Sequence, residues 1–370
     1  MKKQKKELSY GNYPDISSVR KVLIIKLRHL GDVLLTSPVF SYLKKAAPQV
    51  EIDAYVYREA YPMLEGHTAI RDIITYDREW KKLSFFSRMR KEIAILQQIH
   101  KKKYDLVINL TEGDRGAIAA KASHAKIIVG IDPGKSGMKG KKKIYSHLVK
   151  NCPSPRHAVE KNLDSLRRIG LFPKEEEKKI FFYIPQKIKE KMEKFLLEKE
   201  FSKGFILIHP TSRWRFKCWQ NKKWEACAKK LTEKGEKIIF TAGKEFFEKQ
   251  MVQEITKNLP KESFLDLSGK VTVKELGALI EKSKILLTVD SVPFHIASAL
   301  SSFSLALFGP TSEKNWGPWK NKKGKAIYLD IPCRPCMLDG CGGSKVSDCL
   351  SSFPEKKVLE EIEELFYKYL

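Results

Sequence analysis

Strand-like and helix-like segments alternate along almost the whole chain of 370 residues. Short apolar runs, which are typical of buried strands, are followed by longer stretches with the periodicity of amphipathic helices. This order of elements predicts an α/β fold, in which doubly wound parallel sheets are covered by helices on both faces. The length of the chain favours two such domains.

The expected strands cover 21–27, 50–56, 71–76, 105–110, 126–130, 205–209, 237–241, 284–289 and 303–308. The expected helices cover 33–46, 85–102, 157–170, 221–234, 244–258, 292–300 and 355–369.

The composition along the chain divides it into four segments. Residues 1–19 form a basic extension, 20–175 a first α/β domain and 176–352 a second one, and the highly charged stretch 174–190 links the two. The last segment, 353–370, is predicted to be a helix, and the first domain is one surface on which it can pack back. Because ligands bind at the carboxyl ends of strands in open α/β sheets, we expect the strand-end loops of both domains to line one cleft.

The formal net charge of +26, from 70 Lys+Arg against 44 Asp+Glu, indicates an anionic partner. Nucleic acid, an anionic membrane and a phosphorylated substrate all fit this charge, and so does a surface of solvated lysines. The cations are scattered and are not interleaved with aromatic side chains, which disfavours a platform for single-stranded nucleic acid. The sequence has no run of 18 apolar residues and no signal peptide, so we expect a cytoplasmic location.

The first predicted strand ends in a basic turn that is followed at once by a carboxylate. Lys26, Arg28 and His29 precede Gly31 and Asp32. Asp32 can accept backbone hydrogen bonds at a helix N-cap, or it can act as a general base whose charge the nearby cations maintain. No GxGxxG motif accompanies this turn, which disfavours a nicotinamide dehydrogenase.

The strand end after 205–209 carries groups that suit a diphosphate. Thr211 and Ser212 offer hydroxyls, and Arg213 and Lys217 offer cations. A surface loop with an amphipathic edge is the alternative.

Three other strand ends of the second domain also suit an anionic nucleotide. Asp290 ends a strand, and Ser291 can cap the helix that carries His295, which would leave an anion site at the helix N-terminus. The other two are turns, Gly243 with the acidic Glu245, suited to ribose hydroxyls, and Gly309 with Pro310. Taken alone, each of these features also fits an ordinary turn or a capped helix.

Four of the seven cysteines have the spacing C-x2-C-x4-C-x7-C, and they are Cys333, Cys336, Cys341 and Cys349. Four thiolates can hold a tetrahedral zinc ion, and reduced structural thiols are the alternative. No D-x-D motif occurs, so a metal held by paired aspartates against a diphosphate is not expected.

Taken together, these motifs resemble glycosyltransferase family 9, the ADP-heptose:lipopolysaccharide heptosyltransferases. The resemblance runs from about residue 21 to 350 and rests on KLRHLGDVLLTSPV, HPTSRWRFKCW and VDSVPFHIASAL, of which the last two are most similar to the branch called heptosyltransferase III. It implies a GT-B fold, with two Rossmann-like domains facing across a cleft and the donor in the second. It also implies an inverting, metal-independent transfer of heptose from ADP-L-glycero-D-manno-heptose to the inner core of lipopolysaccharide, without a required cofactor.

The same resemblance implies roles for individual residues. Asp32 matches the catalytic base, and Lys217 matches the lysine that neutralises the donor diphosphate. Phe247 stands at the simplest match for the family's ribose-binding glutamate, so Glu245 or Glu248 has to replace it. The implied donor-binding residues are Thr211, Ser212, Arg213, Gly243, Glu245, Asp290, Ser291, His295, Gly309 and Pro310. The implied acceptor-binding residues are Lys26, Arg28, His29, Gly31, Glu112, Arg115 and His157.

The implied acceptor is embedded in the inner membrane, so we expect peripheral binding to the anionic cytoplasmic face of that membrane. Nucleic acid is not an expected partner. Two alternatives stay open: a family 9 transferase with another nucleotide sugar or acceptor, and a basic nucleic-acid-binding protein, which the charge alone favours.

Overall fold

The computed structural model describes residues 13–369 and divides into two units, Met1–Phe181 and Phe182–Leu370. Residues 1–12 of the predicted basic extension lie outside the described residues. The division falls inside the charged stretch 174–190. This stretch is not all linker, because helix α6 already begins at Gln186.

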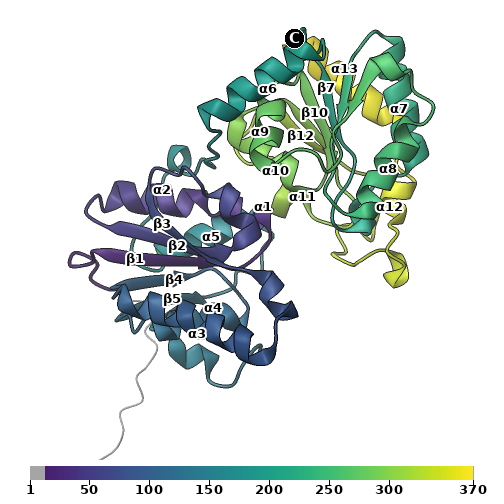
Figure 1. Cartoon of the computed structure of the whole chain (residues 1–370). Helices are drawn as coiled ribbons and strands as arrows, with labels where there is room; N and C mark the ends of the chain where they lie inside the picture. Colours follow the sequence, from purple (N-terminus) through teal and green to yellow (C-terminus); the bar gives the residue numbers. More distant parts are fainter. Residues whose placement is uncertain (1–12, 370) are drawn as a thin grey trace, which may run out of the picture. The chain divides into compact units, whose positions relative to one another are not determined.

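The first unit is built on six parallel strands in the order β3-β2-β1-β4-β5-β6 (Figure 1). They are β1 (Lys21–Lys26), β2 (Glu51–Tyr57), β3 (Ile70–Tyr76), β4 (Leu106–Asn109), β5 (Ile127–Ile131) and β6 (His147–Val149). The helices are α1 (Leu30–Leu34), α2 (Ser37–Ala46), α3 (Phe85–Lys101), α4 (Asp114–Ala122) and α5 (Ala158–Arg167). Short 3-10 helices are η1 (Arg58–Met63), η2 (Arg78–Lys82), η3 (Lys141–Ile144) and η4 (Glu175–Glu177).

Helices cover both faces of this sheet. The helices α2 and α5 contact each other on one face, and α3 and α4 contact each other on the opposite face (Figure 1). The central strand β1, KVLIIK, is consequently buried along four successive apolar residues, as parallel strands covered on both sides require.

The second unit repeats this plan with the strand order β12-β11-β10-β7-β8-β9. Its strands are β7 (Ile206–His209), β8 (Ile238–Phe240), β9 (Phe264–Asp266), β10 (Ile285–Val289), β11 (Ser304–Leu307) and β12 (Gly324–Ile327). Its helices are α6 (Gln186–Glu198), α7 (Asn221–Glu233), α8 (Phe246–Thr256), α9 (Val273–Lys282), α10 (Val292–Leu300), α11 (Glu313–Trp316), α12 (Asp348–Ser351) and α13 (Glu355–Tyr369). Short 3-10 helices are η5 (Arg215–Lys217), η6 (Lys261–Ser263) and η7 (Cys341–Gly343).

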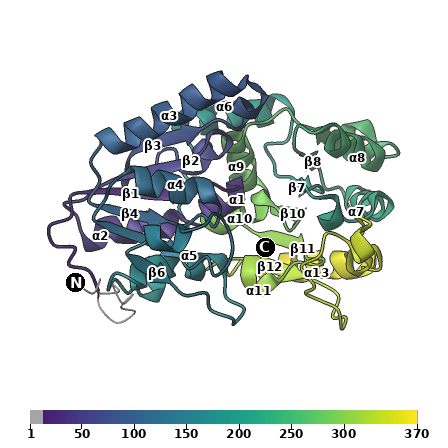
Figure 2. The same cartoon turned by 90° about the horizontal axis from the view of Figure 1, so that it is seen from below.

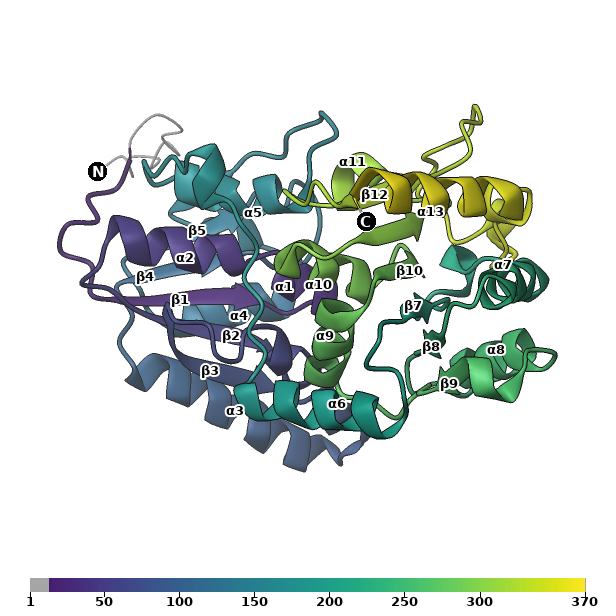
Figure 3. The same ribbon diagram turned by 90° about the horizontal axis from the view of Figure 1, so that it is seen from above.

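The helices α7, α8 and α13 cover one face of this second sheet, and α6, α9 and α10 cover the other (Figures 2 and 3). The buried side chains Val358, Ile362 and Leu365 of α13 belong to the same core cluster as Trp224. The C-terminal helix therefore contributes to the core of the second unit.

In both units the chain reverses its direction of strand addition next to the first strand. The first strand, β1 or β7, pairs on one side with the strand that follows it and on the other with the fourth strand, β4 or β10. Such switch points open a crevice at the carboxyl ends of the two strands, where ligands of doubly wound sheets bind. The prediction of two doubly wound parallel sheets is confirmed.

Some predicted elements differ from the observed ones. The expected helix 33–46 is broken between Leu34 and Ser37, because Pro38 has no N–H to donate to the carbonyl of Leu34. The strands β6, β9 and β12 and the helices α4, α6, α9, α11 and α12 were not predicted. Within residues 13–369, no helix combines the length and the apolar composition needed to cross a membrane.

Candidate functional site

Asp32 lies at the switch point of the first unit, in the first turn of α1 directly after β1. The N-cap position of α1 belongs to His29, so Asp32 does not cap its own helix. The side chain of Asp32 is half-buried, and within residues 13–369 no group donates a hydrogen bond to its carboxylate. A half-buried carboxylate of this kind is able to accept a proton from a bound hydroxyl.

Lys26 ends β1 and contacts the neighbouring elements of the same unit. Its Nζ donates to the carbonyl of Leu110 at 3.0 Å and to Asn162 Oδ1 at 3.2 Å. Burial lowers the pKa of the Lys26 ammonium, and the charges of Asp32 and Glu112 oppose that shift. The three residues therefore interact electrostatically, although they come from two different strand ends.

The remaining predicted acceptor residues divide into two groups. Gly31 is buried, whereas Arg28 and Glu112 are exposed beside the same strand ends. Arg115 and His157 have structural contacts instead. The Arg115 guanidinium stacks 4.2 Å from the centre of the Tyr76 ring, and His157 caps α5 by accepting from the N–H of Val159 at 3.2 Å.

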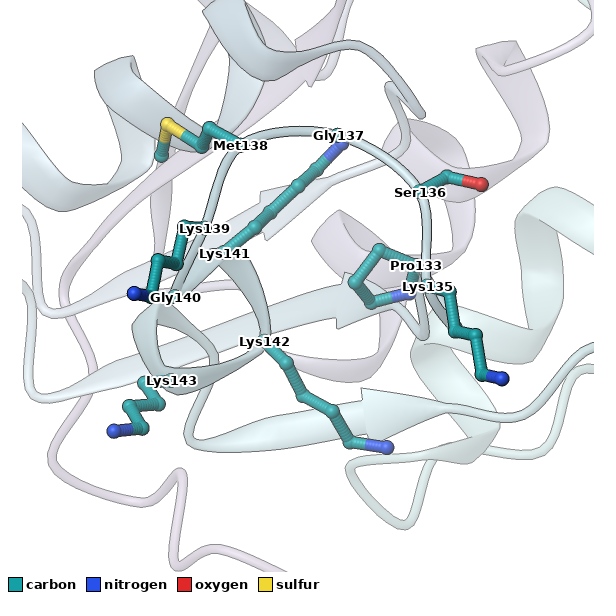
Figure 4. A pocket seen from close by; sticks show the side chains of 11 residues that line it. Pro133, Lys135, Ser136, Gly137, Met138, Lys139, Gly140, Lys141, Lys142 and Lys143 are labelled. Carbon is teal, nitrogen blue, oxygen red and sulfur yellow. The ribbon is translucent and has the colours of Figure 1, made fainter.

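The basic stretch of the first unit forms a loop around a hollow of about 470 Å³ (Figure 4). Lys141 is buried, and its Nζ crosses the loop to the carbonyl of Glu112 and to Asp114, 3.1 Å away. Lys135, Lys139 and Lys143 are exposed, and Figure 4 shows their ammonium groups pointing in different directions. The loop thus presents a diffuse positive surface and not a converging anion site.

The switch point of the second unit holds a partly buried ion pair. Lys217, at the end of η5, donates to Asp290 Oδ2 at 2.7 Å, and Thr311 Oγ1 donates to the same oxygen at 2.6 Å. Asp290 is 4% exposed and follows β10, whereas Thr311 follows β11. Because an ammonium has three N–H donors, Lys217 keeps two for an anionic ligand while Asp290 fixes its position.

A second carboxylate lies at the neighbouring strand ends, and it is Glu248 instead of Glu245. Glu248 Oε2 accepts from Thr211 Oγ1 at 2.6 Å and from the N–H of Gly243 at 3.1 Å. Glu248 is buried, whereas Glu245 occupies the N-cap of α8 with an exposed side chain. Of the two acidic residues that the sequence left open at this turn, the structure turns Glu248 inward and leaves Glu245 exposed.

Ser291 was predicted to cap α10 with its side chain, and within residues 13–369 the structure does not show this hydrogen bond. Ser291 occupies the N-cap position, but in the described chain its hydroxyl lies 3.1 Å from Thr288 Oγ1 and does not cap the helix. His295 is buried one turn further along, where its ring packs near those of Phe294 and Trp316. We therefore assign His295 to packing in this unit.

The turn of Gly309 and Pro310 is held by a residue that the sequence did not single out. Arg334 donates to the carbonyls of Gly309 at 2.6 Å and Thr311 at 3.0 Å, and it pairs with Glu313 at 2.8 Å. Its side chain is only 4% exposed. Arg334 thereby fixes the loop that presents the Thr311 hydroxyl to Asp290.

The other predicted donor residues lie on the rim of this cluster. Ser212 is buried, and its N–H donates to Cys218 Sγ at 3.3 Å. Arg213 is exposed, with its guanidinium 5.7 Å from the centre of the Trp214 ring.

The four clustered cysteines do not form a metal site in the described residues. Cys333, Cys336 and Cys341 are exposed thiols, and Cys349 is buried. Burial raises the pKa of the Cys349 thiol to about 11. No group of three or more potential ligands in residues 13–369 has the geometry to hold a metal ion.

The chain matches one protein-family model and is similar to a heptosyltransferase of known name. Residues 93–346 match the model of the family described as "Glycosyltransferase family 9 (heptosyltransferase)". The chain is 31% identical over 311 residues to lipopolysaccharide heptosyltransferase 3 of Escherichia coli, covering 83% of this chain and 90% of that protein.

Two solved structures share the fold. A family 9 glycosyl transferase from Veillonella parvula superposes with a TM-score of 0.79 at 22% identity, over 96% of this chain and 99% of that one. An E. coli heptosyltransferase solved with ADP gives a TM-score of 0.72 at 20% identity, over 93% of this chain and 99% of that one.

Proposed function

Since this chain belongs to glycosyltransferase family 9, the heptosyltransferases, we propose that it transfers a heptose from ADP-L-glycero-D-manno-heptose to the inner core of lipopolysaccharide. The name of the E. coli relative supports the heptose and the acceptor, and the ADP bound by the solved E. coli heptosyltransferase supports the nucleotide of the donor. The observation that carries the proposal is the positioned ammonium of Lys217, which Asp290 holds together with Thr311 at the switch point of the second unit.

In this proposal the second unit holds the donor. The two remaining N–H donors of Lys217 neutralise the diphosphate, and the free oxygen of Asp290 accepts from heptose hydroxyls. Glu248 accepts from the ribose hydroxyls, beside the small turn at Gly243. These assignments rest on the charge and the hydrogen-bonding capacity of each side chain. Contacts with neighbouring residues already hold these side chains in place.

The first unit binds the acceptor and supplies the base. Asp32 removes the proton from an acceptor hydroxyl, and its carboxylate interacts electrostatically with Lys26. Arg28 and the exposed lysines of the 135–143 loop attract the phosphates and carboxylates of the inner core. The protein would act at the cytoplasmic face of the inner membrane, where such an acceptor is anchored.

The reaction is then a single inverting displacement. The acceptor oxygen forms a bond to the anomeric carbon as the bond from that carbon to the diphosphate oxygen breaks. The proton of the acceptor passes to Asp32, and ADP leaves with the electron pair. Lys217 stabilises the charge that develops on the diphosphate, and removal of such a donor typically lowers kcat by about 10²–10³-fold.

A transfer assay with purified protein tests the proposal. ADP-heptose and a heptose-bearing core acceptor are expected to give one added heptose. Asp32→Asn is expected to lower kcat by about 10²–10⁴-fold and to leave the Kd for ADP unchanged, because Asp32 lies in the acceptor unit. Turnover with other nucleotide sugars but not with ADP-heptose would contradict the donor, and full turnover by the Asp32 variant would contradict the base.

A further inference from the structure

Large apolar side chains are exposed together at the start of α3. Phe85 is 70% and Phe86 84% exposed, and Leu83, Met89 and Ile93 are each about two-fifths exposed, at 40%, 39% and 45%. We call these five residues the α3 ridge. Scattered single apolar residues are normal on a protein surface, but a continuous group of this kind marks an interaction site.

The ridge residues lie on a side of α3 that does not face the core of the first unit. The helix α3 buries only Ile95 and Ile99, both in its C-terminal half. Phe85, Met89 and Ile93 are spaced four residues apart and therefore lie one above the other on a single side of the helix. The start of the helix is ordered by Ser84, whose hydroxyl accepts from the N–H of Ser87 at 3.4 Å.

Cations surround the ridge. Residues 78–93 contain six Lys and Arg against two Glu, and one of the six, Arg78, also pairs with Glu59 at 3.1 Å. Both carboxylates are occupied, since Glu79 pairs with Lys82, and Glu92 pairs with Arg88 and accepts from the Tyr76 hydroxyl. The ridge therefore combines aromatic and aliphatic groups with excess positive charge, which is the composition of helices that lie in the headgroup region of anionic membranes.

The position of α3 relates the ridge to Asp32. The helix follows β3 through η2, so it starts from the same carboxyl edge of the parallel sheet at which α1 carries Asp32. β3 and β1 are separated by one strand, so their ends lie roughly 10 Å apart across the sheet. This step rests on the proposed function: a lipid-anchored acceptor held at a membrane by this edge would have its sugars beside the base.

We propose that the α3 ridge inserts into the surface of an anionic membrane and docks the first unit beside its lipid-anchored acceptor. The occupant is the lipid surface and not a second copy of the chain, because the cations around the ridge would repel the same cations on a copy.

Vesicle co-sedimentation of the full chain tests this proposal without donor or acceptor. Vesicles of phosphatidylcholine with 30% phosphatidylglycerol are expected to bind the protein, and pure phosphatidylcholine vesicles to bind it much more weakly. Phe85→Ser/Phe86→Ser is expected to weaken binding to the anionic vesicles by at least about tenfold. Lys81→Ala/Arg90→Ala is expected to weaken it by about fivefold per cation at low salt.

Leu197→Ser, at an apolar residue of α6 that is 66% exposed, is the matched control and should bind like the unchanged protein. Transfer to an acceptor stripped of its acyl chains should be the same in the Phe85/Phe86 variant and the unchanged protein, which separates this proposal from the proposed function. Equal vesicle binding by the Phe85/Phe86 variant, or binding that ignores phosphatidylglycerol, would overturn the proposal. A dimer that becomes monomeric in that variant would overturn it in favour of a second copy.

Discussion

A single methyl group at Gly243 is expected to dislodge the carboxylate that we assign to ribose binding. A Cβ at this position would lie 2.4 Å from Glu248 Oε1 and 2.8 Å from both Cδ and Oε2. Carboxylate groups usually move away from such a clash at little cost. Glu248 cannot do so freely, because its Oε2 is bound by the Thr211 hydroxyl and by the N–H of residue 243 itself.

The magnitude follows from those two hydrogen bonds. A hydrogen bond to a charged group contributes about 1.5–3 kcal/mol. Partial relaxation of the displaced side chain toward water recovers some of this, so Gly243→Ala is expected to lower the free energy of unfolding by about 2–3 kcal/mol. For a unit of this size that corresponds to a fall in Tm of roughly 4–12 °C. Loss of the ribose contact is expected to raise the Kd for ADP roughly 10- to 100-fold.

Thermal unfolding and calorimetric titration with ADP measure the two effects. Gly113→Ala is the control, since a Cβ there meets only Thr111 Cγ2 at 3.7 Å, an ordinary contact. It should leave the Kd for ADP unchanged. A Gly243→Ala protein with unchanged Tm and unchanged ADP affinity would refute the reasoning, because it would mean that Glu248 is not held where the contacts place it.

Three further changes have defined outcomes. Lys217→Ala is expected to lower kcat by about 10²–10³-fold in the transfer assay, whereas an unchanged kcat would remove Lys217 from the chemistry. Arg334→Lys cannot donate to two carbonyls and a carboxylate in one plane, so calorimetry should show weaker ADP binding, and urea unfolding a loss of about 2 kcal/mol. Burial lowers the pKa of His209 from 6.5 to about 4. Between these pH values His209 is protonated in the unfolded chain but not in the folded chain, so the free energy of unfolding should fall as the pH drops from 6.5 to 4. His209→Gln should reduce the fall measured by urea unfolding at pH 7 and pH 5.

The sequence predicted the fold well where strands were long and fully apolar. The run KVLIIK could only be a buried strand, and β1 is found at Lys21–Lys26. The sequence did not predict β6, β9 and β12, which are short strands at sheet edges and lack the run of fully buried apolar residues that marks the central strands. Helix α9 was not predicted, although a capping box marks its start at Thr272. Its Gly277 allows the close approach of Phe182, and no local sequence pattern reveals such a tertiary contact.

The site was predicted to the level of strand ends and no further. The rule that ligands bind at carboxyl ends singled out Lys217, Asp290 and the turn at Gly243. The structure pairs Lys217 with Asp290 and joins the N–H of Gly243 to Glu248. Which acidic residue turns inward depends on the phase of α8, and the helix buries Glu248 and exposes Glu245. Arg334 comes from a segment more than 20 residues after the loop that it holds, so its role depends on tertiary contacts.

The two units share one topology, and each carries an aspartate in a loop at its switch point. After the first strand of its sheet, the first unit has Asp32, whose carboxylate receives no hydrogen bond from the described residues. After the fourth strand of its sheet, the second unit has Asp290, whose carboxylate pairs with the Lys217 ammonium and accepts from the Thr311 hydroxyl. A carboxylate without a hydrogen-bond donor can accept a proton from a ligand, whereas one held by a direct ion pair orients its cation and accepts hydrogen bonds from a ligand. The proposed roles of Asp32 and Asp290 therefore depend on the groups around each carboxylate and not on the residue type, which is the same. A fold of this kind determines where a reaction occurs, and the side chains in its loops determine which reaction it is.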